Sequence, residues 1–478
     1  MARLSTRRRA WTGVALVGGI VAVAAGAWGL QRWAPFADDT EVSWPGNIEP
    51  LADFVEHTTG QHFTEPVAIE FVGDADEYAE RVSVPATPPT AADLADAAVD
   101  EAVGRALGLW RGDVSLVDIH EAYATAPPLP VTWEADAARL IVLAEDGNDD
   151  LSPLVRAEIT LRLTQALDEQ RYHLVRRLDD APTSQDYEVL AALAVGHAIW
   201  VHDQYVDDLS ADDVEDYYSD YDDEVGDFAS AMDDVPVAYR AIRSVGQQLG
   251  PMFVEALSEE GRTLVATAMS TDVPDALDQV SLPAGKYLRR DPLENVSAPP
   301  GPAGAEVRFT NQMGPFALYL LLAPGLPDHE ALTAADGWGN DRYTVYVLDD
   351  RVCVDVHLVA DSRLDADRLE NGLNGWAQQR PEEAAALVAR SGTDLYASAC
   401  DPGTEASQKV PSNDAVEHYM TRADELRQRA DASGDAAFAE CVAVGFYGRF
   451  SFDVASDDDG TDYFAEMDSI EQDCLDAA

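Results

Sequence analysis

The stretch Leu161-Arg-Leu-Thr-Gln-Ala-Leu-Asp-Glu-Gln-Arg-Tyr-His-Leu174 decides the fold that the sequence predicts. It lies inside a longer segment, Leu151 to Leu178, whose residue types favour one long helix. Residues three and four apart share one face of a helix, so Leu163, Ala166 and Leu167 are expected to face the core. The sequence therefore predicts a buried helix near the middle of the chain.

The same stretch resembles the active-site helix of a family of secreted, mostly actinobacterial zinc metallopeptidase-like proteins of the HExxH, gluzincin-like type. In that family the helix reads HELTHALQDQHFDL. This chain shares with that helix residues of its framework rather than of its zinc chemistry: Leu163, Thr164, Ala166, Leu167, Gln170 and Leu174. The resemblance implies a mainly helical α+β fold with a metallopeptidase-like domain.

Further segments resemble the same family in the same order. Residues 192–198 read ALAVGHA and resemble the family's ALVEGDA, whose glutamate is the third zinc ligand. The other matching segments are Leu107–Trp110, Ala138–Val142, Leu277–Tyr287 and Gly337–Tyr343. Together the matches cover roughly residues 47–360.

The residues that carry the chemistry of that family are replaced in this chain. Leu161 and Gln165 stand at the positions of the two zinc histidines, Arg162 at the general base and Val195 at the third ligand. Leucine and valine have no ligand atom, and arginine stays protonated and repels a divalent cation. Because zinc catalysis needs three protein ligands and a metal-bound water, the resemblance implies a site with no catalytic residue and no zinc. We expect Arg162 to lie near the old cleft and to pair with an acidic neighbour.

The chain is extremely acidic. It has 478 residues, with 88 acidic and 32 basic side chains, which gives a formal net charge of −56. Such a surface repels nucleic acid and anionic membranes. It favours either a strongly solvated exterior, of the kind suited to a salty environment, or a surface that binds cations.

The N-terminus predicts export. Arg3, Arg7, Arg8 and Arg9 precede an uncharged run over residues 10–30, which is long enough to span a bilayer as a helix. Basic residues before the run place residues 1–9 in the cytoplasm and the rest of the chain outside. Residues 10–30 are thus interpreted as a retained single-pass membrane anchor, with signal-peptide cleavage near residues 25–27 as the alternative.

Four cysteines fit an oxidising, extracellular compartment. Their spacing is not that of a zinc ribbon, and four cysteines allow three pairings. We predict the pairs that are local in sequence, Cys353 with Cys400 and Cys441 with Cys474. Free thiols are the alternative.

The predicted domain order follows from these features. After a tether over residues 31–46, residues 47–403 form the degenerate metallopeptidase-like ectodomain, which contains small β segments. Residues 404–413 read as a polar linker, and residues 414–478 as a small helical tail with the second disulfide. Within the ectodomain we expect Thr90 to cap a helix, Gly250-Pro251 to break another, and Asp349-Asp350 to form a hairpin turn.

Three histidines and two acidic runs are the remaining candidates for metal binding. His173, His197 and His202 lie near the old site in sequence, but a spacing of five residues is a poor chelating geometry on a helix. The acidic, tyrosine-rich run Asp203–Asp234 has the oxygen ligands that calcium prefers, although like-charge runs are more often exposed and mobile. The run Asp457–Glu466 partly resembles an EF-hand loop but lacks an acidic first ligand. We expect no cofactor, with calcium as the alternative.

The expected function is that of a membrane-anchored extracellular pseudopeptidase with a non-catalytic role. Its partner would be a protein or peptide at the cell surface, and the membrane is contacted through the N-terminal helix. Two alternatives stay open: an active hydrolase with a relocated metal site, and a purely structural envelope protein.

Overall fold

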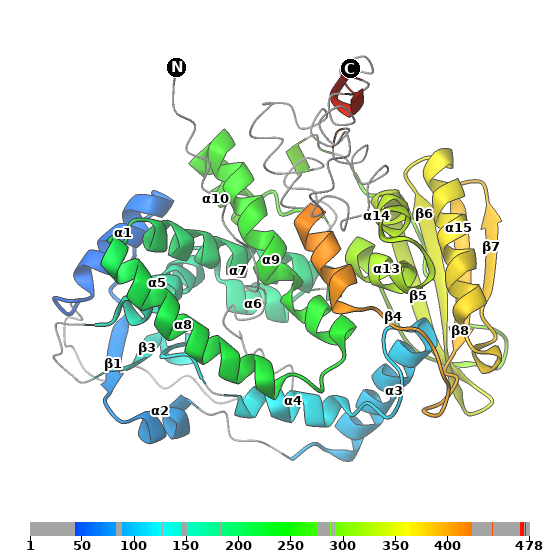
Figure 1. Ribbon diagram of the computed structural model, residues 1–478, viewed down its shortest axis with the longest axis horizontal. Helices are drawn as coiled ribbons and strands as arrows, with labels where there is room; N and C mark the ends of the chain where they lie inside the picture. Colours follow the sequence, from blue (N-terminus) through cyan, green and yellow to red (C-terminus); the bar gives the residue numbers. More distant parts are fainter. Residues whose placement is uncertain are drawn as a thin grey trace, which may run out of the picture.

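The structure is a computed structural model, which describes residues 44–82, 88–126, 128–144, 151–181, 184–275, 287–288, 290, 292–422, 442, 469–472 and 474. The described part is mainly helical and has two small sheets, so the α+β prediction is confirmed at that level. Figure 1 places the first sheet and its helices on one side of the molecule and the second sheet on the other.

The first sheet has the strand order β1-β3-β2. The strands are β1 Ala68–Val72, β2 Val131–Glu134 and β3 Arg139–Leu143. β1 runs parallel to β3, and β2 runs antiparallel to it. Side chains on the inner face, among them Leu140 and Val142, pack in one core cluster with residues of the central helix.

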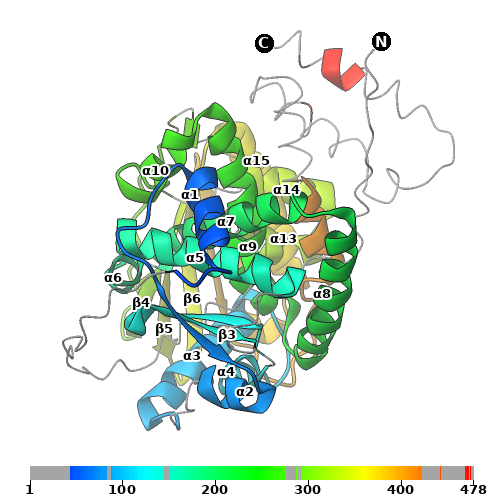
Figure 2. The same ribbon diagram turned by 90° about the vertical axis from the view of Figure 1, so that its left-hand side faces the viewer.

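Helices surround this sheet and fill the centre of the molecule (Figure 2). They are α1 Glu49–Thr59, α2 Ala75–Val82, α3 Ala91–Leu107, α4 Leu116–Thr125, α5 Pro153–Tyr172, α6 Leu174–Asp179, α7 Ser184–Asp207, α8 Ala211–Ala231, α9 Val237–Glu260 and α10 Arg262–Ser270. Thr90 caps α3 as predicted, because its hydroxyl accepts the Asp93 N–H while the Asp93 carboxylate accepts the Thr90 N–H.

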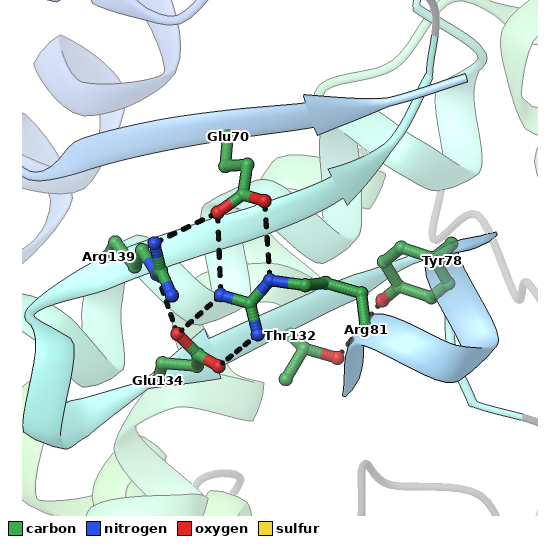
Figure 3. A network of polar contacts seen from close by, with 6 residues as sticks. All are labelled: Glu70, Tyr78, Arg81, Thr132, Glu134 and Arg139. Carbon is green, nitrogen blue, oxygen red and sulfur yellow. Dashed lines mark hydrogen bonds and ion pairs between the residues drawn. The ribbon is translucent and has the colours of Figure 1, made fainter. Parts of the chain in front are cut away.

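The outer face of the first sheet is covered by α2 through an ion-pair network (Figure 3). The Arg81 guanidinium contacts both Glu70 and Glu134, and the Arg139 guanidinium contacts the same two carboxylates. Tyr78, a residue of α2 whose side chain is buried, donates a hydrogen bond from its hydroxyl to the Leu129 carbonyl. The two acidic and two basic groups balance one another, so the network fixes α2 on the sheet without adding net charge.

The second sheet is antiparallel, with the order β4-β5-β6-β8-β7. Its strands and associated helices are β4 Glu306–Asn311, α13 Gly314–Leu322, α14 Asp328–Asp336, β5 Trp338–Leu348, β6 Arg351–Ala360, α15 Arg363–Gln379, β7 Leu387–Ser391 and β8 Asp394–Cys400. Residues 413–422 are helical. The turn at Asp349-Asp350 joins β5 to β6 with positive φ at both residues, which is the predicted hairpin.

The Cys353–Cys400 disulfide is confirmed and joins two directly opposed residues of β6 and β8. Cys474 is also disulfide-bonded, but Cys441 lies outside the described residues, so the second predicted pair stays a prediction. The run Asp457–Glu466 also lies outside them.

One hydrophobic core connects the two sides of the molecule. It runs from α7 and α9, with Leu193 and Phe253, to Val354 and Leu395 of the second sheet. The indole of Trp376 on α15 donates to the Leu107 carbonyl at the end of α3, which ties the helical side to the second sheet. An apolar void of about 10 Å³ in this core, beside Leu318 and Val356, has room for no more than one water molecule.

Two local expectations were wrong. The helix predicted from Leu151 to Leu178 ends at His173, whose left-handed backbone (φ 53°) separates α5 from α6. The expected break at Gly250-Pro251 does not occur, and α9 continues through Pro251. The run Asp203–Asp234 contains the end of α7 and the helix α8, most of whose described side chains are exposed, as is typical of a like-charge run, while Tyr217 is buried against α5 and α7.

Close backbone contact explains why α9 is not interrupted. A Cβ atom at Gly250 would lie 2.2 Å from the Ala192 carbonyl oxygen, and one at Gly196 would lie 2.3 Å from the Gly250 carbonyl carbon. Glycine at these positions therefore lets α7 and α9 pack backbone against backbone, and this packing keeps the helix intact around the proline.

Among the described helices, none has the length and apolar composition needed to cross a bilayer. The run over residues 10–30, which we predict to be the anchor, lies outside the described residues.

Candidate functional site

Helix α5 is the element on which the predicted site depends. Ser152 caps its first turn by accepting the Val155 N–H, and Pro153 stands at the first helical position. Leu163, Ala166 and Leu167 are fully buried, as predicted. These three residues share a core cluster with Leu140 and Val142 of the first sheet, which holds the helix in the core.

Arg162 is buried in an internal polar cluster. Its side chain is only 7% exposed, and its Nη2 lies 3.5 Å from Glu158 Oε2 on the preceding turn. Its Nε donates to the Val131 carbonyl on β2 at 3.2 Å, and Nη1 donates to Gln165 Oε1 at 3.2 Å. The expected pairing with an acidic neighbour is confirmed. The guanidinium is used to join α5 to β2 rather than to line an open cleft.

A second polar contact joins α5 to α7. Asp168 is 0% exposed and His197 2% exposed, and His197 Nδ1 lies 2.9 Å from Asp168 Oδ2. Burial raises the pKa of the Asp168 carboxyl, and the neighbouring imidazole opposes that rise. The Trp200 ring lies nearly parallel to the imidazole, with ring centroids 6.3 Å apart. The pair is therefore sealed inside the helix interface.

A third cluster lies between α7 and α8. His202 Nδ1 is 3.0 Å from Asp203 Oδ1, and its Nε2 is 3.3 Å from the Tyr217 hydroxyl. Tyr217 stacks on Tyr221, and burial raises the pKa of both phenols. These phenols stay protonated at neutral pH and act as hydrogen-bonding and packing groups.

The structure brings only some of the predicted positions together. Arg162 and Gln165 are hydrogen-bonded, and Leu161 is buried on the same helix. Val195 is partly buried on α7.

The candidate metal ligands have other partners or lie apart. His197 and His202 contact different carboxylates, and His173 is exposed at the end of α5. In the part of the chain that the structure describes, no three histidine, cysteine, aspartate or glutamate side chains are grouped so that they could hold a metal ion. In α8, Asp213 forms an ion pair with Arg156 at 3.2 Å.

A further buried carboxylate was missed from the sequence. Asp341 on β5 is 0% exposed and accepts hydrogen bonds from the Met313 and Gly314 N–H groups at the start of α13 and from the Trp338 indole. Burial raises its pKa against the effect of these donors. Asp341 therefore caps α13 from a neighbouring strand. Asp341 lies in the segment Gly337–Tyr343, whose resemblance to the family does not indicate a capping role.

Glu188 on α7 belongs to the same region. Burial, reinforced by the nearby charge of Asp341, raises the pKa of its carboxyl to about 7. Burial raises the pKa of the Tyr343 phenol, and the charges of Asp341 and Glu188 raise it further. The contact between α7 and the second sheet therefore contains a carboxyl that titrates near neutral pH.

Comparisons with known proteins give one family match. Residues 305–417, which include the whole second sheet, match the model of a domain of unknown function, DUF8575. No curated protein matches the chain. No solved structure matches it either. The matched segment excludes α5 and α7, so the metallopeptidase resemblance stays a prediction.

Proposed function

We propose that the protein is an exported, non-catalytic binding protein, a pseudopeptidase whose α5 and α7 are kept as a scaffold. Residues 10–30 hold it in the membrane, or are cleaved as a signal peptide, and the described part lies outside the cell. The Cys353–Cys400 disulfide supports export, because such bonds persist mainly in oxidising compartments.

The contacts of Arg162 are the observation that carries this proposal. A guanidinium cannot take a proton from water near neutral pH. Here it donates to the Val131 carbonyl and to Gln165, and it lies within ion-pair distance of Glu158. A fixed cation in this place also opposes the approach of a divalent metal ion. The position that would activate water in a peptidase is thus used to hold α5 against β2.

The partner is a protein or peptide at the cell surface. A net charge of −56 favours partners with basic surfaces, through faster association and complementary contacts. The same charge opposes binding of nucleic acid.

The scaffold is tested by restoring the lost residues. We expect the variant Leu161→His/Arg162→Glu/Gln165→His/Val195→Glu to bind zinc in a calorimetric titration, because it supplies three ligands. The matched control keeps Val195 and should bind zinc much more weakly. A folded four-site variant that binds zinc no better than the parent would show that these positions do not converge, and the resemblance would be wrong.

A further inference from the structure

The sequence contains a single Asn-x-Ser/Thr triplet, Asn295-Val296-Ser297. Such triplets, with any residue except proline in the middle, are acceptors for N-linked sugars in exported proteins when they lie on the surface. A lone triplet in a chain of this length is unremarkable by itself, so its place in the fold decides whether it can be used.

The triplet lies in an extended segment, residues 292–300, that has no helix or strand. Asn295 and Ser297 are both exposed. Among the described residues, neither side chain makes a hydrogen bond, whereas the main chain around them is fixed. The Glu294 N–H donates to the Gly339 carbonyl, and the Glu294 carbonyl accepts from the Asn340 side chain.

The other end of the segment is also fixed to the second sheet. His357 Nδ1 lies 3.0 Å from the Ser297 carbonyl, and the Thr344 hydroxyl donates to the Pro299 carbonyl at 2.7 Å. The segment is therefore held by its backbone on both sides of the triplet. This leaves the Asn295 amide and the Ser297 hydroxyl free to meet an enzyme in an extended conformation.

We propose that Asn295 is an N-glycosylation site, with a sugar attached on the outer side of the second sheet. The proposal rests on the export proposed above. The donor is a sugar chain linked through phosphate to a membrane lipid. The Asn295 amide nitrogen forms a bond to the anomeric carbon of the sugar and loses a proton, while the bond from that carbon to the phosphate oxygen breaks and the lipid phosphate leaves with the electron pair.

The Ser297 hydroxyl is the recognition group for this transfer, so Ser297→Thr should preserve modification and Ser297→Ala should abolish it. Neither change removes a hydrogen bond among the residues that the structure describes, because Ser297 is bonded there through its carbonyl. Asn295→Gln serves as a second control, since it keeps an amide but displaces it by one methylene group.

The test is the mass of the tryptic peptide Asp291–Arg308 from the full chain purified from its native cells. We expect most of this peptide to be heavier by one or more sugar residues, with fragmentation placing the added mass on Asn295. The same digest, made without reduction, reports whether Cys353–Cys400 is oxidised. A bare peptide in chains with an intact disulfide overturns glycosylation while leaving export standing. A bare peptide in chains with reduced cysteines overturns export, and with it this proposal.

Discussion

Two aspartates are completely buried in the described part of the chain, and they are stabilised in different ways. Asp168, on the helical side, has one hydrogen-bonding partner in the described part of the chain, the His197 imidazole. Asp341, on the side of the second sheet, receives hydrogen bonds from two backbone N–H groups and an indole, none of which titrates. The difference indicates that the buried carboxylate is held by one side-chain partner on the helical side and by backbone and indole dipoles on the sheet side. Neither arrangement requires a catalytic role.

The largest effect is expected at Asp341. Asp341→Ala removes three hydrogen bonds to a charged acceptor, each worth about 1.5–3 kcal/mol, so the free energy of unfolding should fall by roughly 4 kcal/mol or more. Asp341→Asn should lose less, because an amide oxygen still accepts. Urea denaturation measures both. The control Asp350→Asn, at an exposed turn position, should change stability by about 0.5 kcal/mol or less, and an equal loss there would refute the capping role.

A double-mutant cycle tests the Asp168–His197 pair. His197→Leu leaves a buried carboxylate without its partner and should cost about 3–5 kcal/mol. Adding Asp168→Val removes that charge and should recover most of the loss, because apolar replacements of buried pairs are often nearly neutral. Chemical denaturation of the two single variants and the double variant gives the coupling energy. If the losses simply add, the two side chains do not act as a pair.

The smallest of these effects is the pH dependence at Glu188. Its folded pKa, about 7, lies above the unfolded value, so the native state holds more protons between the two values. The stability that the protonated Glu188 carboxyl contributes is fully present below about pH 4, its pKa in the unfolded chain. It is lost as the pH rises to 7. In Glu188→Gln, the free energy of unfolding should therefore fall less between pH 4 and 7, by about 2 kcal/mol or less. Thermal melts from pH 4 to 8 compare the two proteins, and identical slopes would contradict the burial of Glu188 beside Asp341.

Local signals in the sequence were enough to predict several elements. The capping box at Thr90 and the two aspartates of the β5–β6 turn each act through their immediate neighbours. The apolar spacing in α5 likewise identified Leu163, Ala166 and Leu167 as buried, although the helix is buried on nearly all sides. In each case the residues that decide the conformation lie within one or two turns of one another.

The errors arose where distant residues decide the structure. Pro251 stays helical because Gly250 lies against Ala192 of another helix. For the candidate site, the sequence identified Arg162 and its need for an acidic partner. It did not reveal the Asp168–His197 pair, whose members lie 29 residues apart. Nor did it reveal that Asp341 caps a helix that precedes it in the chain.

The central claim is that α5 and α7 form a scaffold whose buried charges serve packing rather than metal chemistry. The most direct test is elemental analysis of the full-length protein after dialysis against zinc and then against buffer. The account predicts that zinc is not retained in stoichiometric amount, because Leu161, Arg162, Gln165 and Val195 provide no ligand set. Retention of about one zinc per chain, the stoichiometry of a single site, that is lost in His173→Ala or His197→Ala would contradict it.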